Sequence, residues 1–170
     1  MKLNDFTGDE QIYPDSSIFI DHHSKDSVYR NSCTEFLKNV EKGDIKATTS
    51  SLAIEETTFI LLKFKSGEIL KTDRHYDIIN KLRTDKELFR RAWEVAEKHV
   101  LYVNALEEMG VLNIVLRMPN SLITNGIAKK YFILPRDANH LAIMKISGIS
   151  DIATTDSDFK IVPGINVRMP

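Results

Sequence analysis

The segment PRDANHLAIMKISGISDIATTD, residues 135–156, shows the order of elements that decides the fold. Residues 137–147 predict a helix that begins shortly after a proline, and Gly148 is suited to end it. Residues 151–155 then predict a strand. A helix followed at once by a strand is typical of parallel sheets, because parallel neighbours are joined by long, usually helical connections.

The same alternation extends along the rest of the chain. Further strands are predicted at residues 17–20, 45–49, 111–116 and 165–169. Further helices are predicted at residues 28–40, 50–64 and, as a pair, within 74–109, and residues 121–131 predict a short helix or a turn. Strands that alternate with helices favour right-handed βαβ crossovers. We therefore expect an α/β fold, a three-layer α/β/α sandwich with a central, mostly parallel sheet.

The composition indicates one globular domain and excludes several classes of protein. We expect this domain at residues 17–170, after an N-terminal extension over residues 1–16. The 170 residues carry 23 Lys and Arg against 24 Asp and Glu, which excludes a surface that is basic throughout. Cys33 is the single cysteine, so an internal disulfide is excluded. The sequence has no apolar run long enough to span a membrane and no signal-peptide pattern, so we expect a cytoplasmic protein without membrane contact.

Acidic residues follow predicted strands or lie near the start of predicted helices. Asp21 and Asp156 each come directly after a predicted strand. Asp137, Glu55 and Glu56 lie in the first turns of predicted helices. Each helix or turn acid has an ordinary role on its own, but an acid that ends a buried strand needs a partner or a metal. Because parallel strands end at the same edge of a sheet, we expect these side chains to converge there.

A cluster of carboxylates has a specific chemical use. Carboxylates held close together raise one another's pKa unless a cation lies between them. Oxygen ligands suit Mg²⁺ or Mn²⁺. Such an ion lowers the pKa of a bound water and offsets the charge on a phosphodiester under attack. The pattern therefore predicts metal-dependent hydrolysis of phosphodiester bonds.

Four blocks of the sequence resemble the PIN-domain family, which includes the VapC-type toxins. The blocks are SIFID at 17–21, TSSLAIEETTF at 49–59, RDANHLA at 136–142 and TTDSDF at 154–159. The last two blocks are the most specific. The resemblance implies the PIN fold over about residues 17–168 and a divalent-metal-dependent endoribonuclease.

The resemblance also implies roles for individual residues. Asp21, Asp137, Asp156 and one helix glutamate would be catalytic and would bind Mg²⁺ or Mn²⁺. Counting along the family pattern favours Glu56 for this position, and Glu55 is the alternative.

Other side chains have supporting roles in this interpretation. Ser50, Thr154 and Asp158 would assist the acids in the family arrangement. Lys130 and Arg136 are basic residues close to the third acid in the sequence. They are our candidates for contacts with the phosphates of RNA, whose backbone must be held near the metal.

The biological role is open at the level of the sequence. The resemblance implies an RNA substrate and, for a toxin, a small antitoxin protein and a homodimer. The alternatives are a housekeeping RNA-processing nuclease and a catalytically inactive PIN-fold module that binds RNA or protein. Residues 1–16 and 74–109 are the segments in which partner binding can differ from that of a compact toxin.

Overall fold

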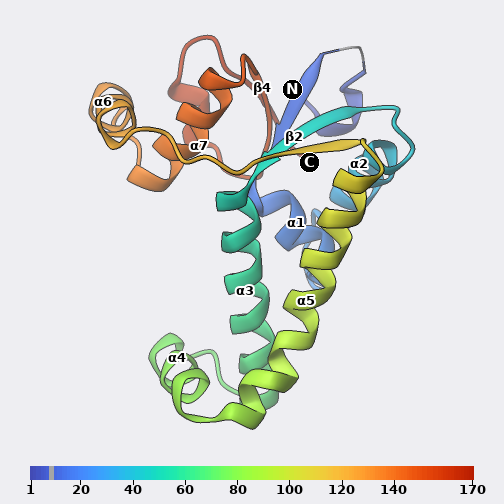
Figure 1. The fold of residues 1–170 in the computed structure, drawn as a ribbon, viewed down its shortest axis with the longest axis vertical. Helices are drawn as coiled ribbons and strands as arrows, with labels where there is room; N and C mark the ends of the chain where they lie inside the picture. The colour runs from blue at the N-terminus through green and yellow to red at the C-terminus, as the bar shows by residue number, and fades with distance from the viewer. Residues whose placement is uncertain (8–9) are drawn as a thin grey trace.

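The computed structural model describes residues 1–7 and 10–170 and contains one five-stranded sheet (Figure 1). All neighbouring strands are parallel, and their order is β3-β2-β1-β4-β5. The strands are β1 (Gln11–Pro14), β2 (Lys46–Ser50), β3 (Leu112–Val115), β4 (Asp151–Ala153) and β5 (Asn166–Arg168). The predicted α/β class with a parallel central sheet is confirmed.

Helices cover both faces of this sheet. The α-helices among the described residues are α1 (Ser16–His23), α2 (Arg30–Glu41), α3 (Ser51–Leu70), α4 (His75–Thr84), α5 (Lys86–Glu108), α6 (Ser121–Tyr131) and α7 (Pro135–Ile146). Short 3-10 helices lie at Leu3–Asp5 and Asp158–Ile161. The helices predicted at 28–40 and 137–147 and the pair within 74–109 are confirmed, and the one predicted at 50–64 is longer. Residues 121–131, expected to form a short helix or a turn, form helix α6.

Strand β1 shows how the layers are held together. Ile12 and Tyr13 are neighbours in this strand, so their side chains point to opposite faces of the sheet. Both are fully buried: Ile12 packs in a cluster with residues of α1, α2 and α5, and Tyr13 in a second cluster with residues of α6 and α7. A strand that is buried on both faces is typical of the centre of a parallel sheet.

The position of β1 corrects two predictions. Residues 17–20, expected to be the first strand, lie in α1, and the strand is Gln11–Pro14. A four-residue apolar run does not distinguish a strand from a buried helix segment. Asp15 caps α1, because its carboxylate accepts a hydrogen bond from the Ser17 N–H, and the helix therefore begins at Ser16.

The structure describes residues 1–7 and 10–16 of the predicted N-terminal extension, and they are part of the domain rather than an extension of it. Residues 8 and 9 lie outside the described part of the chain. Gln11–Pro14 is the central strand. Leu3 is fully buried in the core, and its N–H donates a 2.7 Å hydrogen bond to the carbonyl of Met169 beside the last strand. The N-terminal segment is part of the packed domain.

Two long helices extend from the sheet as an arm. Figure 1 shows α3 and α5 running away from the sheet side by side, with α4 at their far end. A separate apolar cluster holds the three helices together, and it consists of Leu62, Ile78, Leu82, Leu88 and Ala92. No helix in the described part of the chain is both long and apolar enough to cross a membrane.

Candidate metal centre

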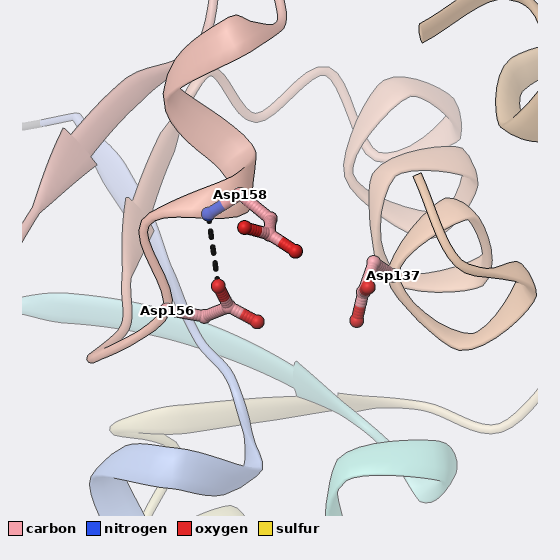
Figure 2. Close-up of side chains that lie close together, drawn as sticks. All are labelled: Asp137, Asp156 and Asp158. Atoms are coloured by element: carbon pink, nitrogen blue, oxygen red, sulfur yellow. Dashed lines mark hydrogen bonds between the residues drawn. The ribbon is translucent and has the colours of Figure 1, made fainter. Parts of the chain in front are cut away.

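Three aspartates converge beyond the carboxyl end of β4. Asp137 lies in the first turn of α7, and Asp156 and Asp158 follow β4. One carboxylate oxygen from each residue lies within 4.8 Å of the others, and Figure 2 shows the three side chains around a common space. The Asp158 N–H donates a 2.8 Å hydrogen bond to Oδ1 of Asp156, which orders this turn. The expected convergence of Asp137 and Asp156 is therefore present, with Asp158 as a third member.

Asp137, Asp156 and Asp158, the aspartate triad, carry negative charges that repel one another. Burial raises the pKa of Asp137, and the negative charges of Asp156, Asp158 and Glu56 raise it further. A divalent cation would remove this repulsion, and carboxylate oxygens are the ligands that Mg²⁺ and Mn²⁺ prefer. The donor set therefore fits a hard divalent ion.

A fourth acid, Glu56, approaches from α3. Its side chain is buried, and each carboxylate oxygen has a partner: Arg136 Nε at 2.6 Å and His140 Nε2 at 3.0 Å. Burial alone would raise the pKa of Glu56, but the His140 hydrogen bond and the His140 and Arg136 charges lower it to about 2. Glu55 is exposed. Of the two glutamates weighed from the sequence, Glu56 is the one that faces the centre.

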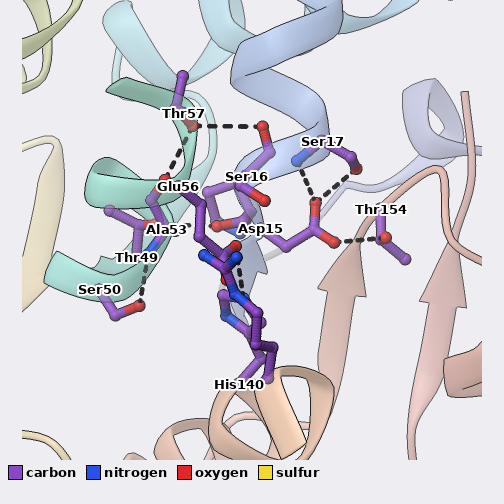
Figure 3. A network of polar contacts seen from close by, with 12 residues as sticks. Asp15, Ser16, Ser17, Thr49, Ser50, Ala53, Glu56, Thr57, His140 and Thr154 are labelled. Carbon is purple, nitrogen blue, oxygen red and sulfur yellow. Dashed lines mark hydrogen bonds and ion pairs between the residues drawn. The ribbon is translucent and has the colours of Figure 1, made fainter. Parts of the chain in front are cut away.

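A fifth acid, Asp15, stands at the end of β1 and is almost fully buried. Its carboxylate accepts hydrogen bonds from the Ser17 N–H at 2.9 Å, the Ser17 hydroxyl at 2.5 Å and the Thr154 hydroxyl at 2.6 Å (Figure 3). Burial raises the pKa of Asp15, and these hydrogen bonds oppose the rise. The Thr154 hydroxyl also accepts from the Asp156 N–H at 2.9 Å. Thr154 thus connects Asp15 to the aspartate triad.

Asp21, expected to be the first acid of the site, does not end a strand. It lies in α1, six residues beyond Asp15, which is about 9 Å along a helix axis. Its carboxylate accepts a 2.6 Å hydrogen bond from the Ser27 hydroxyl. We expected Asp21 to come directly after the first strand, but the acid at that position is Asp15. The sequence signal for it is an acid followed by Ser16 and Ser17, the pattern of a capped helix start.

The family follows from comparison with known proteins. Residues 12–165 match the sequence model of the PIN domain. The chain belongs to the PIN domain family. The match includes residues 12–14 of β1 and also Asp15. No curated protein matches the chain in sequence.

Solved structures share the fold of this PIN domain. VapC20 of Mycobacterium tuberculosis, a toxin that cleaves the sarcin–ricin loop, has a TM-score of 0.57 and 14% identity, covering 92% of this chain and 98% of its own. VapBC2 of Rickettsia felis, solved with a promoter DNA fragment, has a TM-score of 0.51 and 11% identity, covering 94% and 98%. PAE2754 of Pyrobaculum aerophilum has a TM-score of 0.50 and 15% identity, covering 93% and 88%. At such identities the likeness shows the fold alone.

A buried network of polar contacts that contains Ser50 connects to the acids of the PIN domain. The Tyr13 hydroxyl lies 2.6 Å from the Ser50 hydroxyl and 2.7 Å from Nδ1 of His140. Ser50 also caps α3, accepting from the Ala53 N–H at 3.3 Å. His140 continues the network to Glu56, so β1, α3 and α7 are joined through side chains. Nε2 of His140 lies 3.0 Å from Oε2 of Glu56.

The two residues predicted to contact the substrate, Arg136 and Lys130, lie close to Asp137 in the sequence. Arg136 is on the first turn of α7, and its side chain stays 64% exposed although it pairs with Glu56. Lys130 is exposed on the last turn of α6, with its Nζ 5.1 Å from the centroid of the Tyr131 ring. Both side chains are accessible to a ligand.

Proposed function

We propose that this PIN domain is a divalent-metal-dependent endoribonuclease that hydrolyses RNA phosphodiester bonds. The observation that supports it best is the aspartate triad, in which carboxylates from α7 and from the segment after β4 lie within 4.8 Å. The raised pKa of Asp137 adds to this, because it results from burial and from charges that a cation would balance. Membership of the PIN family makes a nuclease the expected activity.

The residues of the chain have distinct roles in this proposal. Asp137, Asp156 and Asp158 hold Mg²⁺ or Mn²⁺, with Glu56 beside them. When bound, such an ion lowers the pKa of a coordinated water and offsets negative charge on the phosphodiester. Asp15 and Thr154 keep the turn at Asp156 in place through their shared hydrogen bonds.

The phosphates on either side of the bond that is cut need positive charge. Arg136 and Lys130 are exposed, and both lie close to Asp137 in the sequence. These two side chains supply the positive charge. Arg136 contacts Glu56 through Nε, so the guanidinium keeps other N–H groups for a phosphate oxygen.

The biological role that we propose is that of a toxin neutralised by a small antitoxin protein. The similar folds support it: VapC20 is a toxin that cleaves the sarcin–ricin loop, and VapBC2 was solved with promoter DNA. A housekeeping RNA-processing nuclease would use the same centre. Cleavage of a defined RNA that stops growth, and its reversal by a protein encoded beside this chain, would favour the toxin.

We also propose a homodimer, and the helical arm offers a surface for it. Four aromatic side chains on α3 and α5 are 38–46% exposed, which is large for apolar groups: Phe59, Phe64, Phe89 and Trp93. Sedimentation analysis of the chain and of Trp93→Lys tests this. We expect a dimer that the substitution weakens, and a monomer at all concentrations would refute it.

The experiment for the activity compares acids inside and outside the centre. We expect RNA cleavage with Mn²⁺ by the unsubstituted chain, and cleavage reduced at least 100-fold in Asp137→Asn and Asp15→Asn. Asp21→Asn is the matched control, since it removes the same charge from α1 outside the site, and it should retain activity. Equal cleavage by all four proteins would indicate a contaminating nuclease. Absence of Mn²⁺ binding in calorimetry would favour a catalytically inactive binding module.

A further inference from the structure

One aromatic side chain near the metal centre has no role in the packing of the domain. Phe132 is 93% exposed and ends α6 in the left-handed backbone region, with φ of 57°. Bulky residues rarely adopt this conformation, which glycine and asparagine favour. The next residue, Ile133, is buried and its N–H bonds to the Ala128 carbonyl at 3.3 Å, so the turn is held without the phenyl ring. The fold therefore gains little from this ring.

The segment of the chain that contains Phe132 is basic. Residues 121–136 contain three basic residues and no acidic one; the basic residues are Lys129, Lys130 and Arg136, and all three are exposed. The Tyr131 ring lies 5.1 Å from Lys130 Nζ and 5.2 Å from Lys145 Nζ, which keeps both ammonium groups near this corner. An exposed aromatic ring within a basic segment of the chain matches a single-stranded nucleic acid, whose phosphates take the charge and whose bases stack.

The corner is also close to the acids along the chain. Asp137 comes five residues after Phe132, so the two Cα atoms are at most about 18 Å apart. Figure 1 shows α6 and α7 next to each other, and α7 begins at Pro135, directly after this turn. A ring at that distance reaches a nucleotide close to the phosphodiester at the centre.

We propose that Phe132 is a stacking platform for an unpaired RNA base that flanks the cleaved bond. The inference rests on the proposed ribonuclease function and deepens it, because it makes single-stranded RNA the preferred substrate. Duplex RNA would not use the platform, since its bases are already stacked.

The test measures RNA binding apart from cleavage, using fluorescence anisotropy of a labelled oligouridine on the Asp137→Asn background with Mn²⁺. Phe132→Gly suits the left-handed position, so misfolding cannot explain a loss. We expect this variant to bind about 5-fold to 100-fold more weakly, Phe132→Leu to share the defect, and Phe132→Trp to restore binding. Lys71→Gly is the matched control, because Lys71 also ends a helix with φ of 53°, far away on the arm.

The outcomes separate the two proposals. If Phe132→Gly and Phe132→Leu bind oligouridine as well as the parent, the platform is wrong, and the exposed ring instead belongs to a protein-binding surface. If the loss is equal for duplex RNA, base stacking is likewise refuted. If the unsubstituted chain neither binds nor cleaves RNA, the proposed function itself fails and this inference fails with it.

Discussion

The hydroxyl of Thr154 donates a 2.6 Å hydrogen bond to the carboxylate of Asp15, which lies 139 residues away in the sequence. The two residues follow neighbouring parallel strands, β4 and β1, and both are buried. The same hydroxyl accepts the N–H of Asp156 at 2.9 Å. One side chain therefore holds the first acid and the turn of the aspartate triad together.

Removal of this hydroxyl should destabilise the domain. Thr154→Val keeps the shape but leaves a buried Asp15 oxygen without a donor, so we expect the free energy of unfolding to fall by about 1–3 kcal/mol. Urea denaturation followed by circular dichroism measures this. Thr154→Ser retains the hydroxyl and should lose much less. A loss in Thr154→Ser as large as that in Thr154→Val would contradict the hydrogen-bond explanation, because serine keeps the hydroxyl.

The ion pairs of Glu56 should make stability depend on acid pH. Its pKa falls from 4.5 to about 2 on folding, so its charge stabilises the domain fully above pH 4.5, and this contribution is lost as the pH falls through 2. We expect Glu56→Gln to lower the free energy of unfolding at pH 7 by up to about 3 kcal/mol, and by much less near pH 2.5. Urea denaturation at both pH values measures the difference.

The neighbouring Glu55 provides the control, because it is exposed and Glu55→Gln removes the same charge from the same helix. That variant should match the unsubstituted chain at both pH values. A deficit in Glu56→Gln that stays constant down to pH 2.5 would contradict the ion-pair explanation.

A buried histidine should add acid sensitivity at a milder pH. His99 is fully buried in α5 beside Phe19 and His23, and among the described residues neither ring nitrogen has a hydrogen-bond partner. Burial, with the nearby His23 and His22, lowers the pKa of His99 to about 3. When the pKa of a histidine is lower in the folded state than in the unfolded state, the unfolded chain binds the proton first as the pH falls. The contribution of this histidine to stability is therefore fully present above about pH 6.5 and is lost as the pH falls below that value.

We therefore expect His99→Leu to reduce the loss of stability between pH 6.5 and pH 4.5. The difference should reach about 2–3 kcal/mol, since one pKa unit corresponds to about 1.4 kcal/mol. Denaturant titrations across this pH range measure it. His75→Leu is the control, because His75 is exposed on α4. Parallel pH profiles for His99→Leu and the parent would show that His99 is not buried neutral.

Two glycines inside helices should respond in opposite ways to alanine. A Cβ on Gly67 of α3 would lie 2.9 Å from the Thr72 carbonyl oxygen and 3.2 Å from Ile78 Cδ1, whereas a Cβ on Gly126 of α6 would meet nothing within 4 Å. We expect Gly126→Ala to raise stability by about 0.5–1 kcal/mol through helix propensity. Gly67→Ala should lower it by about 1–3 kcal/mol, because the close backbone oxygen outweighs that gain.

Thermal unfolding of both variants measures this contrast. A melting temperature that rises in both would show that the turn after α3 adapts to the added methyl group. A fall confined to Gly67→Ala would show that close packing at this turn holds the arm of α3, α4 and α5 together.

Most of the architecture could be predicted because it is encoded by local patterns. The helix at 137–147 begins shortly after a proline and is followed by Gly148, and the alternation of helices with strands indicates a parallel sheet. Asp137 and Asp156 were found for the same reason, since each stands at the boundary of an element. Glu56 was separated from Glu55 by family spacing, and the structure shows why it differs: one side chain is buried and the other exposed.

What the sequence by itself determined is therefore the fold class, the family and two aspartates of the candidate metal centre. Only the tertiary structure decided where the first strand lies, and with it that Asp15 rather than Asp21 is the acid at the end of that strand. The physical reason is that β1 obtains its hydrogen bonds from β2 and β4, which are distant in the chain. Residues 17–20 have no such partners and fold as a helix capped by Asp15.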